Sequence, residues 1–283
     1  MSNPWLKNKG ESDRPRKSNE RPARSAEHAD RGESAGRPSR DEVRWYGFNA
    51  VLATFAQRPE AIRKVYVSGS RLRDAADLLK WCADNRIGYR VVDDADLERL
   101  TKSQHHEGLV ADVLPLPVLD LQEWLDSAPS DRDCAIWLDG VGNPHNLGAI
   151  LRSAAHFGAS ALLLPPARAA QGVAGAAARV AEGGAEHVRL VALRERPIDN
   201  LTILRRHDYR ALATVVEGGT NLFRAEMPAK TVWMLGAEGE GMDRSLAELA
   251  DAQISIPGTG NVESLNVANA AAVLLAASFG ATE

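Results

Sequence analysis

Three polar loops in the second half of the chain each follow a short apolar run that is typical of a buried strand. With the run that precedes each, they are Ala135–Leu138 with Asp139–Asn146, Val232–Leu235 with Gly236–Gly241, and Ile254–Ile256 with Pro257–Leu265. Loops that follow parallel strands meet at one edge of a sheet, where α/β proteins carry their binding sites. We therefore expect one site that the three loops build together.

The residue types in these loops restrict the ligand. A dinucleotide-binding turn would show G-x-G-x-x-G after the first strand of a βαβ unit, whereas Gly236, Gly239 and Gly241 come late and at another spacing. The chain also lacks the Walker motif and its lysine, which bind a polyphosphate. Backbone-rich turns with apolar walls suit a neutral, adenosine-like ligand better.

The first loop and the helix after it carry two candidates for chemistry. Asn146 directly precedes a helical pattern over 147–157, so it is either the N-cap of that helix or a site residue. Arg152 lies opposite the apolar stripe of this helix, together with His156 one turn further on. It is therefore either a solvated surface charge or a group that faces a ligand.

The other two loops add three candidates. Glu238 stands in the glycine-rich second loop, where a charge is usually solvated. Ser264 and Asn266 flank Leu265 at the start of the last helical pattern, and either residue could cap that helix. Because this last helix is apolar nearly all round, we expect it to be buried in the core or in a subunit interface.

These stretches resemble the SpoU (TrmH) family of S-adenosylmethionine-dependent RNA ribose methyltransferases, of the SPOUT superfamily. The resemblance rests on the order and spacing of DGVGNPHNLGAILRSAAHFGA, LGAEGEGM and IPGTGNVESLNVANAAA, with a looser match at RVAEGGAEHV. It implies that backbone groups hold S-adenosylmethionine around Leu235, Gly236, Ile256 and Leu265. It also implies a catalytic pocket lined by Asn146, Arg152, Glu238, Ser264 and Asn266. The implied substrate is RNA, either tRNA or rRNA.

By the same resemblance, Arg152 engages the phosphate of the target nucleotide and helps to deprotonate the ribose 2′-hydroxyl. Because guanidinium stays protonated, it is a poor general base, and orienting the phosphate so that this group or water takes the proton is chemically easier. The cofactor's sulfonium is already activated, so methyl transfer needs alignment of the reacting atoms and no metal or catalytic triad. The alternative function is an RNA-binding protein that keeps the SpoU fold and cofactor pocket with little or no turnover.

Four parts are expected along the chain: a disordered basic tail (1–42), a small α/β RNA substrate-binding domain (43–113), a linker (114–130) and a SpoU-type methyltransferase domain (131–283). The first 40 residues carry ten basic and six acidic side chains and few apolar ones, so they cannot form a core. Strand and helix patterns alternate in both later domains. For the methyltransferase domain this predicts an α/β fold with a mainly parallel sheet covered on both faces.

The predicted small domain begins with a helix over Trp45–Phe55 and resembles the N-terminal substrate-binding domain of many SpoU-family enzymes. In its closing segment, Glu107 stands where the family usually has Gln. The resemblance also implies a deep trefoil knot at the C-terminal end and a homodimer.

Composition excludes several other classes. The two cysteines, Cys82 and Cys134, lie far apart without a C-x-x-C partner, which indicates reduced thiols and no metal site. No long apolar run indicates export or membrane insertion, so a cytoplasmic protein is expected. The formal net charge is −4, which makes the chain after the basic tail acidic and argues against tight non-specific RNA binding.

Overall fold

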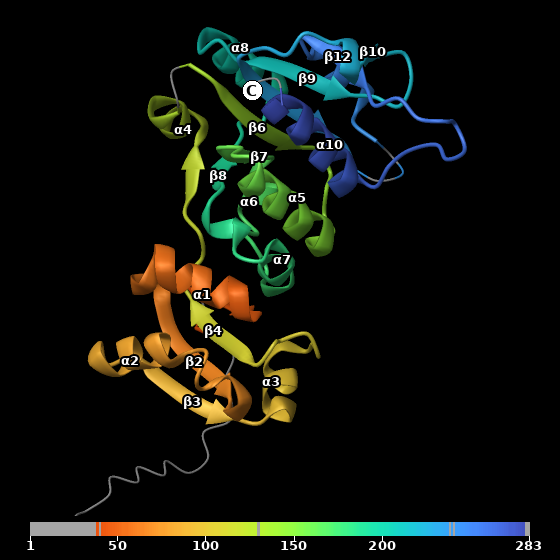
Figure 1. The fold of residues 1–283 in the computed structure, drawn as a ribbon. Helices are drawn as coiled ribbons and strands as arrows, with labels where there is room; N and C mark the ends of the chain where they lie inside the picture. The colour runs from red at the N-terminus through yellow and green to blue at the C-terminus, as the bar shows by residue number, and fades with distance from the viewer. Residues whose placement is uncertain (1–37, 40, 129–130, 238, 240, 281–283) are drawn as a thin grey trace, which may run out of the picture. The chain divides into compact units, whose positions relative to one another are not determined.

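The computed structural model describes residues 38–39, 41–128, 131–237, 239 and 241–280 (Figure 1). The predicted tail, 1–42, therefore lies almost wholly outside the described residues, and so does Glu238. The described residues belong to one compact unit that contains two β-sheets.

The smaller sheet has four strands in the order β1-β4-β2-β3. Its strands are β1 (Val43–Tyr46), β2 (Ile62–Ser68), β3 (Gly88–Val92) and β4 (Leu109–Val113). The helices that accompany it are α1 (Phe48–Gln57), α2 (Ala76–Asp84) and α3 (Asp94–Thr101), with the short turns η1 (Pro59–Ala61) and η2 (Gly69–Arg71). β4 is antiparallel to β1 and β2, whereas β3 is parallel to β2.

The predicted helix over Trp45–Phe55 is wrong in its first turn. Trp45 and Tyr46 belong to β1, where they pair with Ala111 and Val110 of β4. Gly47, at φ +100°, then turns the chain into α1. This pairing buries Trp45 completely, and a partner strand so far along the chain leaves no mark on the local periodicity of the sequence.

The larger sheet has eight strands in the order β10-β12-β9-β11-β6-β7-β8-β5, and every neighbouring pair is parallel. Its strands are β5 (Val118–Asp120), β6 (Asp133–Leu138), β7 (Ala161–Leu164), β8 (Arg189–Ala192), β9 (Arg210–Thr214), β10 (Thr220–Asn221), β11 (Lys230–Leu235) and β12 (Ala252–Ser255). The helices around it are α4 (Leu121–Ser127), α5 (Pro144–His156), α6 (Pro166–Ala169), α7 (Gly175–Ala181), α8 (Pro197–Arg206), α9 (Arg244–Leu249) and α10 (Val267–Gly280), with the turns η3 (Gly184–Glu186) and η4 (Leu222–Arg224). The prediction of an α/β fold with a mainly parallel sheet is confirmed.

Helices cover both faces of this sheet. Successive residues of its inner strands point to opposite sides, so apolar side chains on each side pack against a separate set of helices. In β6, Ile136 and Leu138 pack in a cluster that includes residues of α5, α7 and α10. Ala135 and Trp137 pack in a second cluster with α4, α8 and α9. The inner strands are therefore apolar on both faces, as a buried parallel strand must be.

Part of the predicted linker, 114–130, is regular structure. Val118–Asp120 forms β5, the edge strand that pairs with β8. Asp120 also caps α4, since its carboxylate accepts from Glu123 N at 2.8 Å while the Glu123 carboxylate accepts from Asp120 N at 2.9 Å. Only residues 114–117 connect β4 to β5 without regular structure.

Candidate functional site

The three loops lie at one edge of the larger sheet, as expected. They follow β6, β11 and β12, which run in parallel with β9 among them. In the structure, the first loop is 139–143, the second 236–243 and the third 256–266.

The first and second loops are in direct contact. Asp243 N donates a hydrogen bond to Asp139 Oδ2 at 3.2 Å, and Asp139 N donates to Leu235 O at 2.8 Å. A Cβ atom on Gly140 would lie 3.1 Å from the Cβ of Ala237. The two loops are thus packed at backbone distance, which leaves little freedom for either to move alone.

The second loop closes tightly over Gly236. Ala237 and Gly241 exchange two backbone hydrogen bonds, of 3.1 and 2.9 Å. A Cβ atom on Gly236 would lie only 2.1 Å from Met242 N, so no other residue fits there without moving the loop. The preceding Leu235 is buried. This turn presents backbone at the sheet edge, as a site that binds its ligand through main-chain groups requires.

The first and third loops are joined by Asn146 and Asn266. The Nδ2 of Asn266 donates to the Oδ1 of Asn146 at 3.1 Å. The Oδ1 of Asn266 accepts from Ala268 N at 2.9 Å, which confirms the predicted capping role of Asn266 at α10. The amide group of Asn266 therefore caps α10 through Oδ1 and bonds to Asn146 through Nδ2.

The interpretation of Asn146 as an N-cap is wrong. The helix begins earlier, at Pro144, and Asn143 caps it by accepting from His145 N at 2.9 Å. Proline is common at the first helical position because its missing N–H has no helical partner there, and this signal locates the start correctly. Asn146 lies in the first turn of α5, so its side chain is available for Asn266.

Arg152 is exposed on α5, as predicted, and so is His156 one turn further on. The residues of the apolar stripe, Leu147, Ile150, Leu151 and Ala154, are buried. Six residues separate Arg152 from Asn146, which places the two side chains about 120° apart around the helix. Within the described residues, Arg152 makes no hydrogen bond or ion pair with another predicted site residue.

The remaining predicted residues lie at the same edge of the sheet. Ile256 directly follows β12 and is half-buried against the core. Ser264 is exposed, and Leu265 is 46% exposed although it precedes a buried helix. The predicted cofactor residues thus lie at the ends of β11 and β12 and before α10, whereas Glu238 lies outside the described residues.

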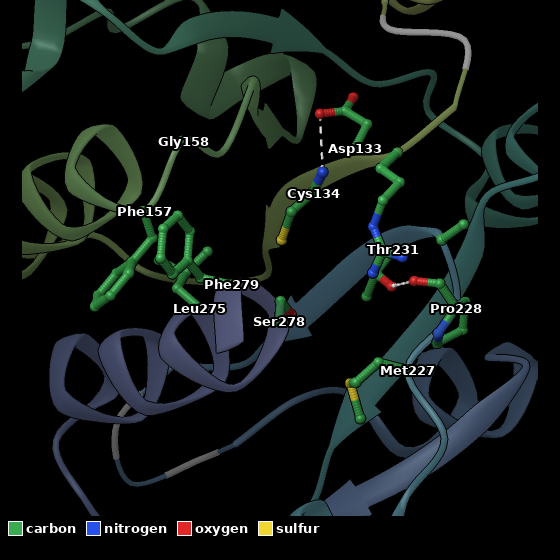
Figure 2. A pocket seen from close by; sticks show the side chains of 12 residues that line it. Asp133, Cys134, Phe157, Gly158, Met227, Pro228, Thr231, Leu275, Ser278 and Phe279 are labelled. Atoms are coloured by element: carbon green, nitrogen blue, oxygen red, sulfur yellow. Dashed lines mark hydrogen bonds between the residues drawn. The ribbon is translucent and has the colours of Figure 1, made fainter. Parts of the chain in front are cut away.

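A cavity of about 140 Å³ lies at the opposite edge of the sheet (Figure 2). It is lined by the starts of β6 and β11 and by the last turns of α5 and α10. Two of its polar side chains are bonded within the protein: Thr231 Oγ1 donates to Pro228 O at 3.0 Å, and Ser278 Oγ accepts from Trp233 Nε1 at 2.8 Å. Burial raises the pKa of the Cys134 thiol to about 12, so this thiol is no nucleophile near neutral pH. The cavity contains none of the predicted site residues.

Two further findings concern the described part of the chain. It contains no helix of the length and apolarity that a membrane span requires. It also contains no group of three or more His, Cys, Asp and Glu side chains arranged to hold a metal ion.

Comparison with known families identifies the family of the chain. The profile of the SpoU rRNA methylase family matches residues 133–276, which contain all three loops. The chain belongs to this family. A second profile, described as RNA 2'-O ribose methyltransferase substrate binding, matches residues 45–118. The predicted family is confirmed, and with it the class of enzyme: an RNA 2′-O-ribose methyltransferase that uses S-adenosylmethionine.

Individual relatives show the extent of the similarity. The chain is 38% identical over 235 residues to the uncharacterized tRNA/rRNA methyltransferase YfiF of Escherichia coli O157:H7, covering 83% of this chain and 67% of the relative. It is 37% identical over 234 residues to the 23S rRNA (guanosine-2'-O-)-methyltransferase RlmB of Ralstonia nicotianae, covering 81% of this chain and 92% of the relative. The crystal structure of the SpoU methyltransferase AviRb from Streptomyces viridochromogenes, in complex with AdoMet, has the same fold. Its TM-score is 0.69 at 22% identity, over 85% of this chain and 90% of that one.

Proposed function

We propose that the chain methylates a ribose 2′-hydroxyl of RNA at the sheet edge where its three loops meet. The observation that carries this proposal is the hydrogen bond between Asn146 and Asn266, which joins the first family motif to the last. A protein that only binds RNA elsewhere on its surface would have no need of this bond.

The residues at this edge fit S-adenosylmethionine. When bound, the cofactor supplies an activated methyl group. The turn at Gly236 is closed by the backbone of Gly241 and Met242, since a Cβ atom on Gly236 would lie 2.1 Å from Met242 N, and this packing fixes the main chain of the second loop at the sheet edge. Together with Leu235, Ile256 and Leu265 it forms the proposed adenosine pocket, in which backbone groups supply the polar contacts and apolar side chains exclude water.

The proposed roles of the remaining residues follow from the geometry of methyl transfer. The enzyme must align the ribose oxygen with the methyl carbon and manage one proton. Arg152 is exposed and permanently charged, so it suits the phosphate of the target nucleotide. Asn146 and Asn266 hold each other's amides in place beside the reacting groups, with Ser264 and Glu238 as the other proposed members of the pocket.

Ribosomal RNA is the proposed substrate, with guanosine as the target nucleoside. This proposal is supported by the similarity to relatives named 23S rRNA (guanosine-2'-O-)-methyltransferase. The match to the Ralstonia protein, for example, covers 92% of that relative's length. The small domain, 43–113, is proposed to recruit this RNA to the methyltransferase domain, 131–283. An RNA substrate places the proposed activity in the cytoplasm.

A homodimer and a deep trefoil knot complete the proposal. α5 and α10 pack together, and α10 carries small or apolar residues on its outer side, of which Ala276 is exposed and Ala272, Val273 and Ala277 are half-buried. Such a face suits a two-fold contact with a second copy. The insertion of β11 and β12 between earlier strands of the sheet supports the knot.

Mapping of ribose methylation in total RNA tests the function. A strain without this protein should lose methylation at one ribosomal guanosine, and the purified protein should restore it with S-adenosylmethionine. Loss at a tRNA position instead would correct the substrate. An unchanged methylation pattern, with RNA binding intact, would favour the RNA-binding alternative.

A further inference from the structure

A turn of two glycines, Gly183 and Gly184, lies between α1 and α5. A Cβ atom on Gly183 would lie 2.9 Å from the Cβ of Ala53 on α1. A Cβ atom on Gly184 would lie 2.9 Å from Leu151 O and 3.0 Å from the Cα of Arg152 on α5. The turn is therefore packed at backbone distance against both helices, with one glycine facing each.

Glu186, at the end of this turn, is tied to α1. Its carboxylate accepts from Thr54 Oγ1 at 2.7 Å and from Arg58 Nε at 2.6 Å. The side chain of Glu186 is 1% exposed and that of Arg58 15% exposed. Arg58 also donates to Leu114 O at 3.1 Å, so its guanidinium is fixed from two sides. A buried pair of this kind cannot lose one partner without leaving an uncompensated charge.

A second ion pair, Glu107–Arg179, lies at the start of α1 and connects this end of the helix to α7. Glu107 accepts from Phe48 N at 3.0 Å, at the end of α1 where Gly47 offers no side-chain cap. Its other oxygen accepts from Arg179 Nη1 of α7 at 3.3 Å. A glutamine at this position could not form the ion pair, which gives the departure of Glu107 from the family a structural consequence.

We propose that Glu186 is a positioning residue for methyl transfer, acting through Arg152. The Arg58–Glu186 pair fixes the turn against α1. Because Gly184 packs against the backbone of α5 at Arg152, the position of the turn determines the position of that backbone. Because packed interiors transmit displacement, loosening Glu186 shifts the guanidinium that the proposed function assigns to the target phosphate. The inference rests on that role of Arg152 and adds a residue that does not touch the substrate.

A double-mutant cycle tests this coupling. Glu186→Gln keeps the volume of the side chain and removes its charge. Its single-turnover rate of methyl transfer to the mapped RNA is compared in the wild-type and Arg152→Lys backgrounds, with melting temperature and S-adenosylhomocysteine affinity. We expect a loss of about tenfold in the wild-type background and little further loss beside Arg152→Lys. Cofactor affinity should stay within about twofold, because the adenosine pocket uses other loops.

Matched variants separate the outcomes. Glu248→Gln makes the same chemical change in the exposed Arg244–Glu248 pair and should leave the rate unchanged. If Glu186→Gln does not fold, Arg58→Lys perturbs the same pair while keeping both charges, and the same cycle applies. Equal losses in both backgrounds, or a lower melting temperature with an unchanged rate, would overturn the positioning role alone. An Arg152→Ala rate equal to wild type would remove Arg152 from the mechanism and with it this inference.

Discussion

Asn266 donates a hydrogen bond to Asn146 across 120 residues of sequence, at 3.1 Å. This bond joins the first turn of α5 to the residue that caps α10. At the other ends of the two helices, the rings of Phe157 and Phe279 lie 6.0 Å apart. The helices after the first and third loops are thus in contact at both ends, which holds the starts of α5 and α10 together.

The asparagine pair makes a first prediction. Asn146→Ala removes the hydrogen bond and no helix cap, so stability should change by less than about 0.5 kcal/mol. Misalignment of the reacting groups should nevertheless lower the single-turnover rate roughly 10- to 100-fold. Asn143→Ala is the matched control: it removes the cap of α5, should cost about 1 kcal/mol of stability, and should affect the rate less. An unchanged rate in Asn146→Ala would place Asn146 outside the reaction.

The glycine turn of the second loop makes a second prediction. Gly236→Ala introduces a Cβ atom 2.1 Å from Met242 N, which must displace the loop. We expect S-adenosylhomocysteine affinity, measured by isothermal titration, to fall at least about tenfold, or 1.4 kcal/mol. Gly258→Ala, in the third loop, has no atom within 4 Å of the added Cβ and should bind normally. Equal affinities for both variants would argue against an adenosine pocket at Gly236.

The oligomeric state makes a third prediction. Ala276 is exposed on α10, so Ala276→Asp should leave the fold intact and place an unpaired charge in the proposed dimer interface. Sedimentation equilibrium at micromolar concentration should show a wild-type dimer and a monomeric variant. Leu275 is 1% exposed, so Leu275→Asp should unfold the chain instead. Ala167→Asp, on an exposed position of α6, is the control, and a monomeric wild type would contradict the dimer.

The motif loops and their flanking elements could be predicted because each signal is local. A buried parallel strand is a short apolar run, and the loop after it breaks the pattern with Gly, Pro or Asn. The capping role of Asn266 follows from the same local rules, since its side chain bonds Ala268 two residues on.

Long-range partners explain what could not be predicted. Trp45 is strand because it pairs with Ala111, and Val118–Asp120 is strand because it pairs with β8. Glu186 stands in the loosest of the four motifs, and its partner Arg58 lies 128 residues away. None of these three pairings leaves a trace in composition or periodicity, so only the structure shows that Glu186 is buried.

The central claim is that Arg152 drives methyl transfer to RNA. Arg152 is exposed and lies off the apolar stripe of α5, so Arg152→Ala should keep the melting temperature and S-adenosylhomocysteine affinity of the wild type. Single-turnover transfer from S-adenosylmethionine to the mapped RNA measures its role most directly. We predict a rate about 100-fold below wild type, equal to roughly 2.7 kcal/mol of transition-state stabilisation. Equal rates for the two proteins, or no transfer by wild type to any cellular RNA that it binds, would contradict the claim.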